Sequence, residues 1–255
     1  MYEDVHIEIK SPSELDIMRI GGRILDEILD KLIIRAKPGL TTWDLEMMAR
    51  KLFKEMKVEP AFLGYKDYPA ALCTSLNEEV VHGIPSHHRV LMQGDLLKID
   101  AGLYHKGFYV DAARTVAVGR VDDDSRKLMD VAQEALLAGI QKAQVGNRLG
   151  DISYAIQNMA EGHGFSVVRE YTGHGIGRRL HESPQVPNFG SPNSGPRLKP
   201  GMVFALEPMV NAGCWETKVL ADQWTVVTAD GRRSTHFEHT VAIRENGPEI
   251  LTQQA

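Results

Sequence analysis

This sequence of 255 residues has few cysteines, no long apolar run and only a small excess of negative charge. The chain contains two cysteines, Cys73 and Cys214, so the sequence does not favour a disulfide-stabilised scaffold, and a reducing cytoplasmic location is expected. No apolar run approaches the roughly 20 residues of a membrane span. The net charge of −5 provides no basic surface for nucleic acid or an anionic membrane. We therefore expect neither a membrane nor a specific nucleic acid as a partner.

The composition that remains is that of a globular protein, with 43% hydrophobic and 25% charged residues. Helical periodicity predicts two pairs of helices. The first helix begins at Ser11, which forms a capping-box pattern with Glu14, and the second begins at Thr41. The second pair covers residues 125–143 and 149–160. Short apolar runs bounded by Gly, Pro and Asn follow each pair and predict strands.

The order of two helices followed by strands occurs twice, which indicates an internal repeat. Gly94 and Gly201, each three residues after a leucine, are separated by 107 residues, and the same interval separates Asp44 from Asp151. Several matches at one interval are not explained by chance. The sequence therefore predicts an α+β fold with one catalytic domain over residues 1–255. Its two pseudo-symmetric halves, approximately 11–120 and 121–251, would each pack a helix pair on a shared antiparallel sheet.

Acidic residues lie within apolar runs of the predicted strands. Asp100 and Asp111 flank a predicted hairpin turn, and a turn centred on His105 and Lys106 would place the two aspartates directly opposite each other. Two facing carboxylates in an apolar setting require a proton or a cation. For this pair alone, an aspartate exposed at the turn explains the pattern equally well.

The second half contains two further acidic residues in apolar settings, Glu207 and Glu238. By the repeat, Glu207 corresponds to Asp100 and Glu238 approximately to Asp111, so pseudo-twofold symmetry would gather four carboxylates between the halves. With a nearby histidine, they suit one or two divalent ions such as Mn²⁺, Fe²⁺, Co²⁺ or Zn²⁺. The sequence therefore favours a metal site.

Histidine occurs ten times, and His174 has the most informative surroundings because three glycines accompany it. Glycine allows close backbone approach, which favours a functional role for His174 and for the nearby His181. His82 lies in a similar loop. We interpret His87 and His88 as solvated, whereas two histidines beside Glu238, His236 and His239, are candidates to support the ligands.

The chain resembles the type I methionine aminopeptidases of the bacterial short form from about Ser11 to Leu251. Five motifs carry the resemblance: His82-Gly-Ile-Pro, the Asp100 and Asp111 pair, Thr172-Gly-His174-Gly-Ile-Gly, Glu207-Pro-Met and Phe237-Glu238-His-Thr.

The resemblance implies a pita-bread fold and removal of the initiator methionine from nascent proteins and peptides whose second residue is small. A metal-bridging hydroxide would attack the peptide carbonyl, with Glu207 as the general base and His82 and His181 in contact with the substrate backbone. It further implies that Asp111 and Glu238 bridge two divalent ions. The implied ligand set is Asp100, Asp111, His174, Glu207 and Glu238.

The resemblance also implies an apolar pocket for the methionine side chain, formed by Tyr65, Tyr68, Cys73 and Trp224. Three positions depart from the family pattern. Phe62 stands where many bacterial members have cysteine, Leu180 replaces a usual phenylalanine, and Lys98 replaces a common asparagine. The first two alter the pocket. Lys98 lies two residues before Asp100, so we expect its cation on the same strand face, where it would weaken metal affinity.

Two other functions are compatible with the same fold. Proline dipeptidases and proline-selective aminopeptidases usually carry a separate N-terminal domain, for which this chain has no room. A binding module with a decayed metal site is the non-enzymatic alternative, and the presence of all five ligand positions argues against it. We expect a cytoplasmic monomer. An enzyme that acts on nascent chains is expected to meet the ribosome, although no charge pattern here signals it.

Overall fold

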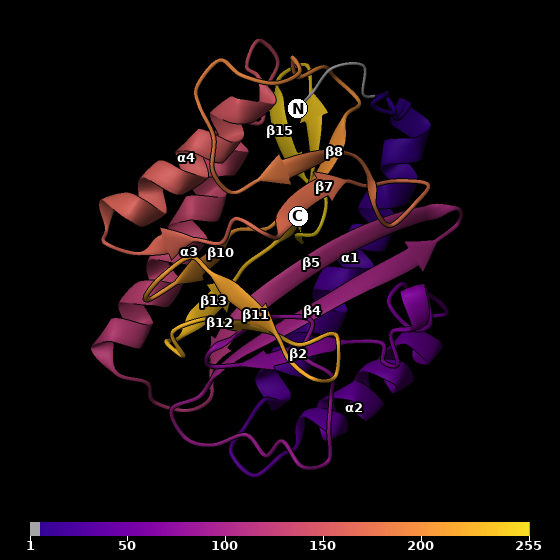
Figure 1. Ribbon diagram of the computed structural model, residues 1–255. Coiled ribbons are helices and arrows are strands. Elements are labelled where there is room, and N and C mark those ends of the chain that lie inside the picture. The colour runs from indigo at the N-terminus through magenta and orange to yellow at the C-terminus, as the bar shows by residue number, and fades with distance from the viewer. Residues whose placement is uncertain (1–5, 255) are drawn as a thin grey trace.

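The computed structural model describes residues 6–254, and Figure 1 shows strands between two pairs of helices. The capping boxes predicted at Ser11 and Thr41 are confirmed, since each side-chain oxygen accepts the backbone N–H three residues later. None of the helices in the described part of the chain is long and apolar enough to cross a membrane. The helices are α1 (Pro12–Arg35), α2 (Thr42–Glu55), the 3-10 helix η1 (Tyr65–Asp67), α3 (Asp123–Lys142) and α4 (Leu149–Gly162).

The strands fall into an earlier group before α3 and a later group after α4. The earlier group is β1 (Glu59–Pro60), β2 (Cys73–Leu76), β3 (Glu79–Val81), β4 (Leu96–His105) and β5 (Phe108–Ala117). The later group is β6 (Ser166–Val167), β7 (Thr172–Gly175), β8 (Glu182–Pro187), β9 (Val203–Leu206), β10 (Met209–Asn211), β11 (Thr217–Val219), β12 (Val226–Thr228), β13 (Ser234–His236), β14 (His239–Arg244) and β15 (Gly247–Ile250).

Antiparallel pairing joins these strands into four sheets. The first has the order β1-β4-β2, with β5 also paired to β4, and the largest has the order β15-β14-β9-β7-β8. Two small sheets, β13-β10-β6 and β11-β12-β3, complete the set. The sheet β11-β12-β3 pairs strands from before α3 and after α4, so the two parts of the chain are interleaved rather than merely adjacent.

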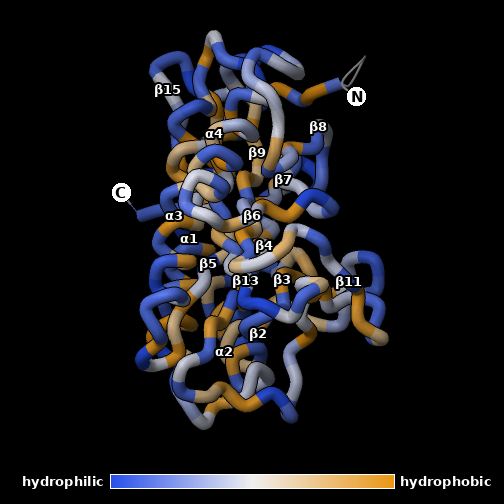
Figure 2. Tube along the Cα trace, turned by 60° about the vertical axis from the view of Figure 1, so that its left-hand side comes forward, coloured by the Kyte–Doolittle hydropathy of each residue, from blue (hydrophilic) through white to orange (hydrophobic). Residues whose placement is uncertain are grey.

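Each helix pair covers strands of its own part of the chain. In Figure 1, α3 and α4 lie at the left, whereas α1 and α2 lie at the right and below. The buried side chains of α1, such as Leu25 and Leu29, belong to one core with Ile99 and Leu103 of β4. A second core contains α3, α4 and β9. Each helix carries both apolar and polar residues along its length, as expected of an element with one buried and one exposed face (Figure 2).

The β4–β5 hairpin has a different register from the one predicted. Asp111 pairs with Gly102 rather than with Asp100. The prediction was wrong because the turn is centred one residue later, on Lys106 and Gly107, whose φ angles are 48° and 92°. A two-residue turn of this kind needs positive φ at both central positions, which Gly107 adopts without strain. The pairing shifts by two residues, so Asp100 and Asp111 still project from the same face of the hairpin.

Candidate metal centre and substrate pocket

Three side chains from different strands converge in the interior of the molecule. Asp111 lies in β5, His174 in β7 and Glu238 between β13 and β14, and one ligand atom of each lies within 4.8 Å of the others. Backbone contacts hold the strands together at this point. The Glu238 N–H donates to the Ala113 carbonyl at 3.0 Å, and the Asp111 N–H donates to Thr240 Oγ1 at 2.9 Å. The cluster is thus built on rigid strands from both parts of the chain.

Asp100 of β4 and Glu207, which follows β9, extend this cluster. Glu207 Oε1 lies 3.6 Å from His174 Nε2. One carboxylate oxygen each of Asp100, Asp111 and Glu238 is buried and accepts no hydrogen bond from residues 6–254. Buried carboxylate oxygens without donors are costly unless a cation satisfies them. These unpartnered oxygens fit a divalent ion.

Burial raises the pKa of all four carboxyl groups, that of Asp111 to about 7. For Asp100, Glu207 and Glu238, the negative charge of neighbouring carboxylates raises the pKa further. Without a cation, burial therefore disfavours ionisation of these carboxyl groups, whereas a divalent cation would favour the ionised form. Oxygen ligands with one imidazole suit Mn²⁺, Fe²⁺, Co²⁺ or Zn²⁺.

His174 is oriented as a ligand by its own backbone. Its Nδ1 lies 2.9 Å from the carbonyl oxygen of Gly175, so we assign the proton to Nδ1, which leaves the Nε2 lone pair facing the carboxylates. Burial, and then the charge of His181, lower the pKa of His174 to about 3, which keeps the imidazole neutral. A Cβ atom at Gly173 would lie 2.4 Å from the Ala205 carbonyl oxygen. Glycine at this position is therefore needed for β7 to approach β9.

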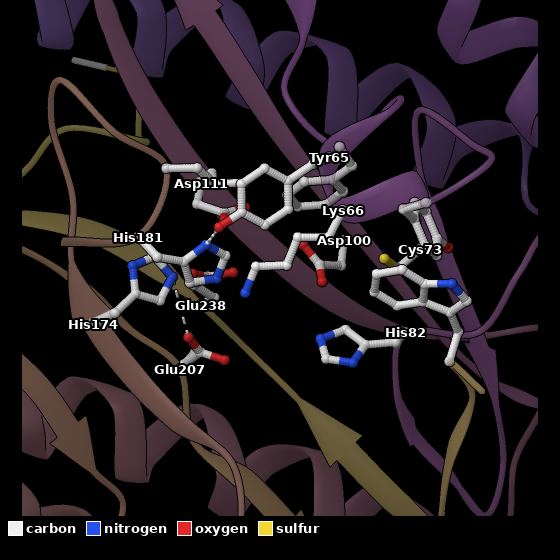
Figure 3. Close-up of a pocket in the computed structure, with 14 residues that line it drawn as sticks. Tyr65, Lys66, Cys73, His82, Asp100, Asp111, His174, His181, Glu207 and Glu238 are labelled. Atoms are coloured by element: carbon white, nitrogen blue, oxygen red, sulfur yellow. Dashed lines mark hydrogen bonds and ion pairs between the residues drawn. The ribbon is translucent and has the colours of Figure 1, made fainter. Parts of the chain in front are cut away.

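The cluster forms one wall of a cavity, which we call the central pocket (Figure 3). Every side chain that the sequence singled out as a ligand, catalytic group or substrate contact lines it. The complete lining is Phe62, Tyr65, Lys66, Tyr68, Cys73, His82, Asp100, Asp111, His174, Leu180, His181, Glu207, Trp224 and Glu238.

The wall opposite the cluster is apolar. Tyr68 and Cys73 are buried, and Trp224 packs edge-on against Tyr68 with ring centroids 5.0 Å apart. The Tyr68 hydroxyl lies 3.0 Å from the Leu72 carbonyl oxygen and 3.1 Å from that of Gly83 and can donate to either, so the ring presents apolar surface to the pocket. Cys73 pairs with Asp100 across β2 and β4, which places the apolar wall beside a carboxylate of the cluster. An apolar, polarisable wall of this kind suits a thioether side chain.

The pocket contains two further histidines: His82 packs edge-on against Trp224 with ring centroids 6.2 Å apart, and His181 packs against His174 with ring centroids 4.2 Å apart. Burial lowers the pKa of His82 and of His181 to about 4, and the positive charge of Lys66 contributes at His181. Both imidazoles are therefore neutral at pH 7 and can donate one N–H each. The Nδ1 atom of His181 lies 2.9 Å from the Tyr65 hydroxyl oxygen, and the preceding residue, Leu180, is buried against the pocket.

The structure places two lysines, Lys98 and Lys66, where the sequence did not predict them. The expected approach of the Lys98 ammonium to the carboxylates is wrong, because Nζ donates to the carbonyl oxygens of Asn77 at 2.8 Å and Ser234 at 3.0 Å. Lys66 lines the pocket although the sequence analysis did not select it. The sequence signal that could have identified Lys66 as a pocket residue was its position directly after Tyr65, in a turn that starts at Gly64.

The histidines beside Glu238 differ from each other in position. His236 is buried, and its Nε2 lies 3.8 Å from Glu207 Oε2, so it borders the carboxylates. His239 points away from them and contacts Thr252 Oγ1 through Nδ1 at 2.9 Å. His87 and His88 are exposed, as the sequence predicted.

Comparison with known families and curated proteins gives consistent results. The model of metallopeptidase family M24 matches residues 16–245. The chain is 50% identical over 246 residues to a methionine aminopeptidase of Clostridium acetobutylicum, covering 96% of this chain and 98% of that protein. It is 51% identical over 244 residues to methionine aminopeptidase 1 of Bacillus subtilis, with 96% and 98% coverage.

Solved structures extend the likeness to three dimensions. A methionine aminopeptidase from Thermotoga maritima matches with a TM-score of 0.96 and 46% identity, covering 98% of this chain and all of that one. An Xaa-Pro dipeptidase from Bacillus anthracis matches with a TM-score of 0.77 and 21% identity, and covers 97% of this chain and 62% of its own. At that identity the second match shows the fold alone. The expected pita-bread fold is confirmed.

Proposed function

The chain belongs to metallopeptidase family M24 and catalyses the metal-dependent removal of N-terminal methionine, and we propose that the central pocket is where this reaction takes place. The observation that carries the proposal is the junction of two surfaces in one cavity. Buried carboxylate oxygens without hydrogen-bond donors form one wall. The apolar wall adjoins it, because Cys73 of the apolar wall pairs with Asp100 of the carboxylate wall across β2 and β4. A methionyl peptide needs this combination of a metal site and an apolar recess.

In our proposal, Asp100, Asp111, His174, Glu207 and Glu238 hold two divalent ions. Asp111, His174 and Glu238 offer ligand atoms within 4.8 Å of one another and would hold an ion together, and Asp100 and Glu207 would supply further oxygen ligands. Bound ions of this type lower the pKa of water and polarise a carbonyl group. The donor set is compatible with Mn²⁺, Fe²⁺, Co²⁺ or Zn²⁺.

The remaining residues bind and orient the substrate. Phe62, Tyr68, Cys73 and Trp224 surround the methionine side chain, and Leu180 closes the pocket beside His181. Binding in this recess directs the first peptide carbonyl toward the carboxylate wall. The second residue then lies close to the cluster, where limited space selects small side chains.

Proton transfer is assigned to Glu207, whose Oε1 lies 3.6 Å from His174 Nε2 and whose carboxylate would accept a proton from a water molecule at the cluster. The neutral imidazoles of His82 and His181 donate hydrogen bonds to the substrate backbone and stabilise charge that develops on the carbonyl oxygen. The Tyr65 hydroxyl, bonded to His181 Nδ1, leaves the Nε2–H of that ring free to donate.

Residues 1–255 are proposed to act as one catalytic domain with repeated halves, although residues 1–5 and 255 lie outside the described part of the chain. The helix pairs α1–α2 and α3–α4 and the ligands drawn from both parts support this organisation. We further propose that the protein is a cytoplasmic monomer that acts on methionyl peptides and on nascent chains near the ribosome.

A peptide series tests the proposed function. With Mn²⁺ present, Met-Ala-Ser should be cleaved with a much higher kcat/KM than Met-Lys-Ser, because lysine is too large beside the metal ligands. Leu-Ala-Ser should be cleaved slowly, since an apolar pocket discriminates against a similar side chain by only about 1–3 kcal/mol. Preference for Arg-Pro-Pro would instead indicate a proline-directed enzyme. No turnover with any peptide or metal would favour a binding module.

A further inference from the structure

Lys66 is a charged residue at the central pocket without an acidic partner. No carboxylate oxygen of the described residues 6–254 lies within 4.0 Å of its ammonium group. The side chain lines the pocket, and Figure 3 shows it reaching inward from the loop that carries Tyr65. Its Nζ lies 5.4 Å from the centroid of the Tyr65 ring, a distance at which the cation is attracted to the aromatic face.

The backbone at Lys66 holds the side chain in this position. Lys66 and Asp67 both adopt positive φ angles, 47° and 68°, in the short helix η1. Non-glycine residues occupy this region at a cost, and they do so most often where the surrounding structure requires a particular side-chain direction. The hydrogen bond from the Gly64 N–H to the Tyr68 carbonyl oxygen closes the turn. Lys66 therefore lies in a hydrogen-bonded turn with an unfavourable backbone conformation, which is typical of ligand-binding sites.

Lys66 lies at the solvent-exposed end of the pocket. Lys66 is exposed, whereas Tyr68 and Cys73 of the apolar wall and Asp100 and Asp111 of the carboxylate wall are buried. A peptide whose methionine fills the apolar recess and whose first carbonyl faces the carboxylates must leave the pocket through this open end. The residues that follow the scissile bond therefore pass Lys66.

We propose that Lys66 is a specificity-determining residue that binds a carboxylate on the leaving side of the substrate. The proposal rests on the proposed function, because that function fixes the direction of the peptide. The carboxylate is either an acidic side chain at the third position or the C-terminal carboxylate of a short peptide. A partly exposed ion pair contributes modestly, so acidic substrates should be favoured about two- to fivefold in kcat/KM, and less at high salt.

The test compares matched peptides in three proteins. The peptides Met-Ala-Asp-Ala-amide and Met-Ala-Asn-Ala-amide differ in one charge, and Met-Ala-Ala as the free acid and as the amide differ in the terminal charge. The variant Lys66→Met removes the ammonium but keeps an unbranched side chain. Lys57→Met is the control, because Lys57 is also exposed and left-handed, with φ 57°, and does not line the pocket.

The expected result is a ratio of kcat/KM between the Asp and Asn peptides that exceeds one in the wild type and in Lys57→Met and falls toward one in Lys66→Met. Loss of the preference for the free acid in the same variant would identify the terminal carboxylate as a second group that Lys66 binds. Equal charge ratios in Lys66→Met and the wild type for both peptide pairs would overturn the proposal. Failure of every protein to cleave any of these peptides would instead overturn the proposed function.

Discussion

The buried ammonium of Lys98 donates a hydrogen bond to the Ser234 carbonyl oxygen at 3.0 Å and so joins the β4 strand to β13. A second bond, to the Asn77 carbonyl oxygen at 2.8 Å, ties in the turn before β3. Burial lowers the pKa of Lys98 to about 7. Lys98 therefore connects the part of the chain before α3 with the part after α4, two residues before Asp100 and four residues before Glu238 at Ser234.

Replacement of Lys98 should affect stability more than metal binding. Lys98→Met removes the donor to the Ser234 carbonyl oxygen and one of two donors to the Asn77 carbonyl oxygen, which keeps the Ser234 N–H at 2.9 Å, so we expect the free energy of unfolding to fall by about 1–3 kcal/mol. Metal affinity should stay within about twofold of the wild type, because the ammonium is bonded away from the carboxylates. Denaturant unfolding and calorimetric titration with Mn²⁺ measure the two effects, with the exposed Lys51→Met as the control. Much tighter metal binding in Lys98→Met would contradict this interpretation.

Removal of a central ligand charge should abolish activity. Asp111→Asn preserves the shape of the side chain but removes a negative charge between the proposed ions, so metal content and kcat should both fall by orders of magnitude. Chelation of the wild type should have the same effect, and added Mn²⁺ or Co²⁺ should restore activity to the wild type but not to the variant. Full activity of the chelated, metal-free wild type would refute a metal-dependent site.

The pKa of Asp111 predicts a pH dependence of the free energy of unfolding after chelation. Its folded value of about 7 exceeds the ordinary value of 3.8, so the folded state binds the extra proton between these limits. The stabilisation of the folded state by the protonated Asp111 carboxyl group is present below about pH 4 and is lost as the pH rises through about 7.

Buried histidines such as His174 have lowered pKa values and act in the opposite direction, so the quantity to measure is the difference in unfolding free energy between the chelated wild type and Asp111→Asn. This difference should decrease from pH 4 to pH 7, because most of the histidine effect cancels. With Mn²⁺ present the trend should reverse for the wild type, since metal binding requires the ionised carboxylate. A flat difference after chelation would show that Asp111 is not protonated at neutral pH.

The contact between Tyr65 and His181 should matter for turnover. Tyr65→Phe removes the hydroxyl that orients the imidazole, so we expect kcat to fall by about tenfold or less, the lower range of a general acid–base or hydrogen-bonding contribution. Tyr154→Phe is the matched control, because Tyr154 is exposed on α4 and does not line the central pocket. The control should leave kcat unchanged. Equal losses of kcat in the two variants would argue against an orienting role for Tyr65.

Deletion of the Cys73 thiol should weaken recognition of methionine. Cys73→Ala enlarges the apolar recess without touching a metal ligand, so KM for methionyl peptides should rise severalfold while kcat and metal content change little. Leucine-first peptides should become relatively better substrates, because the enlarged recess accepts a branched side chain. Steady-state kinetics with Met-Ala-Ser and Leu-Ala-Ser measure both effects. An unchanged KM with a reduced metal content would show that Cys73 acts through its cross-strand partner Asp100.

The sequence by itself determined the local elements and the chemistry available to the site. The caps at Ser11 and Thr41 depend on contacts within three residues, so their patterns were sufficient to place the helix starts. Charged residues within apolar runs of the sequence, such as Glu207, signalled a cation because burial of an unpaired carboxylate is costly whatever the fold.

The tertiary structure decided what depends on contacts between distant residues. The hairpin register depended on which residues accept positive φ at the turn, and Gly107 rather than His105 did so. The direction of the Lys98 ammonium depended on a carbonyl group at Ser234, far away in the sequence, and strand position alone could not predict it. Lys66 was overlooked for the same reason, since its role depends on the cavity that the folded chain encloses. Such hydrogen bonds and cavities form between residues that are far apart in the sequence. Which residues meet depends on how the strands pack, so the sequence pattern of one strand does not identify them.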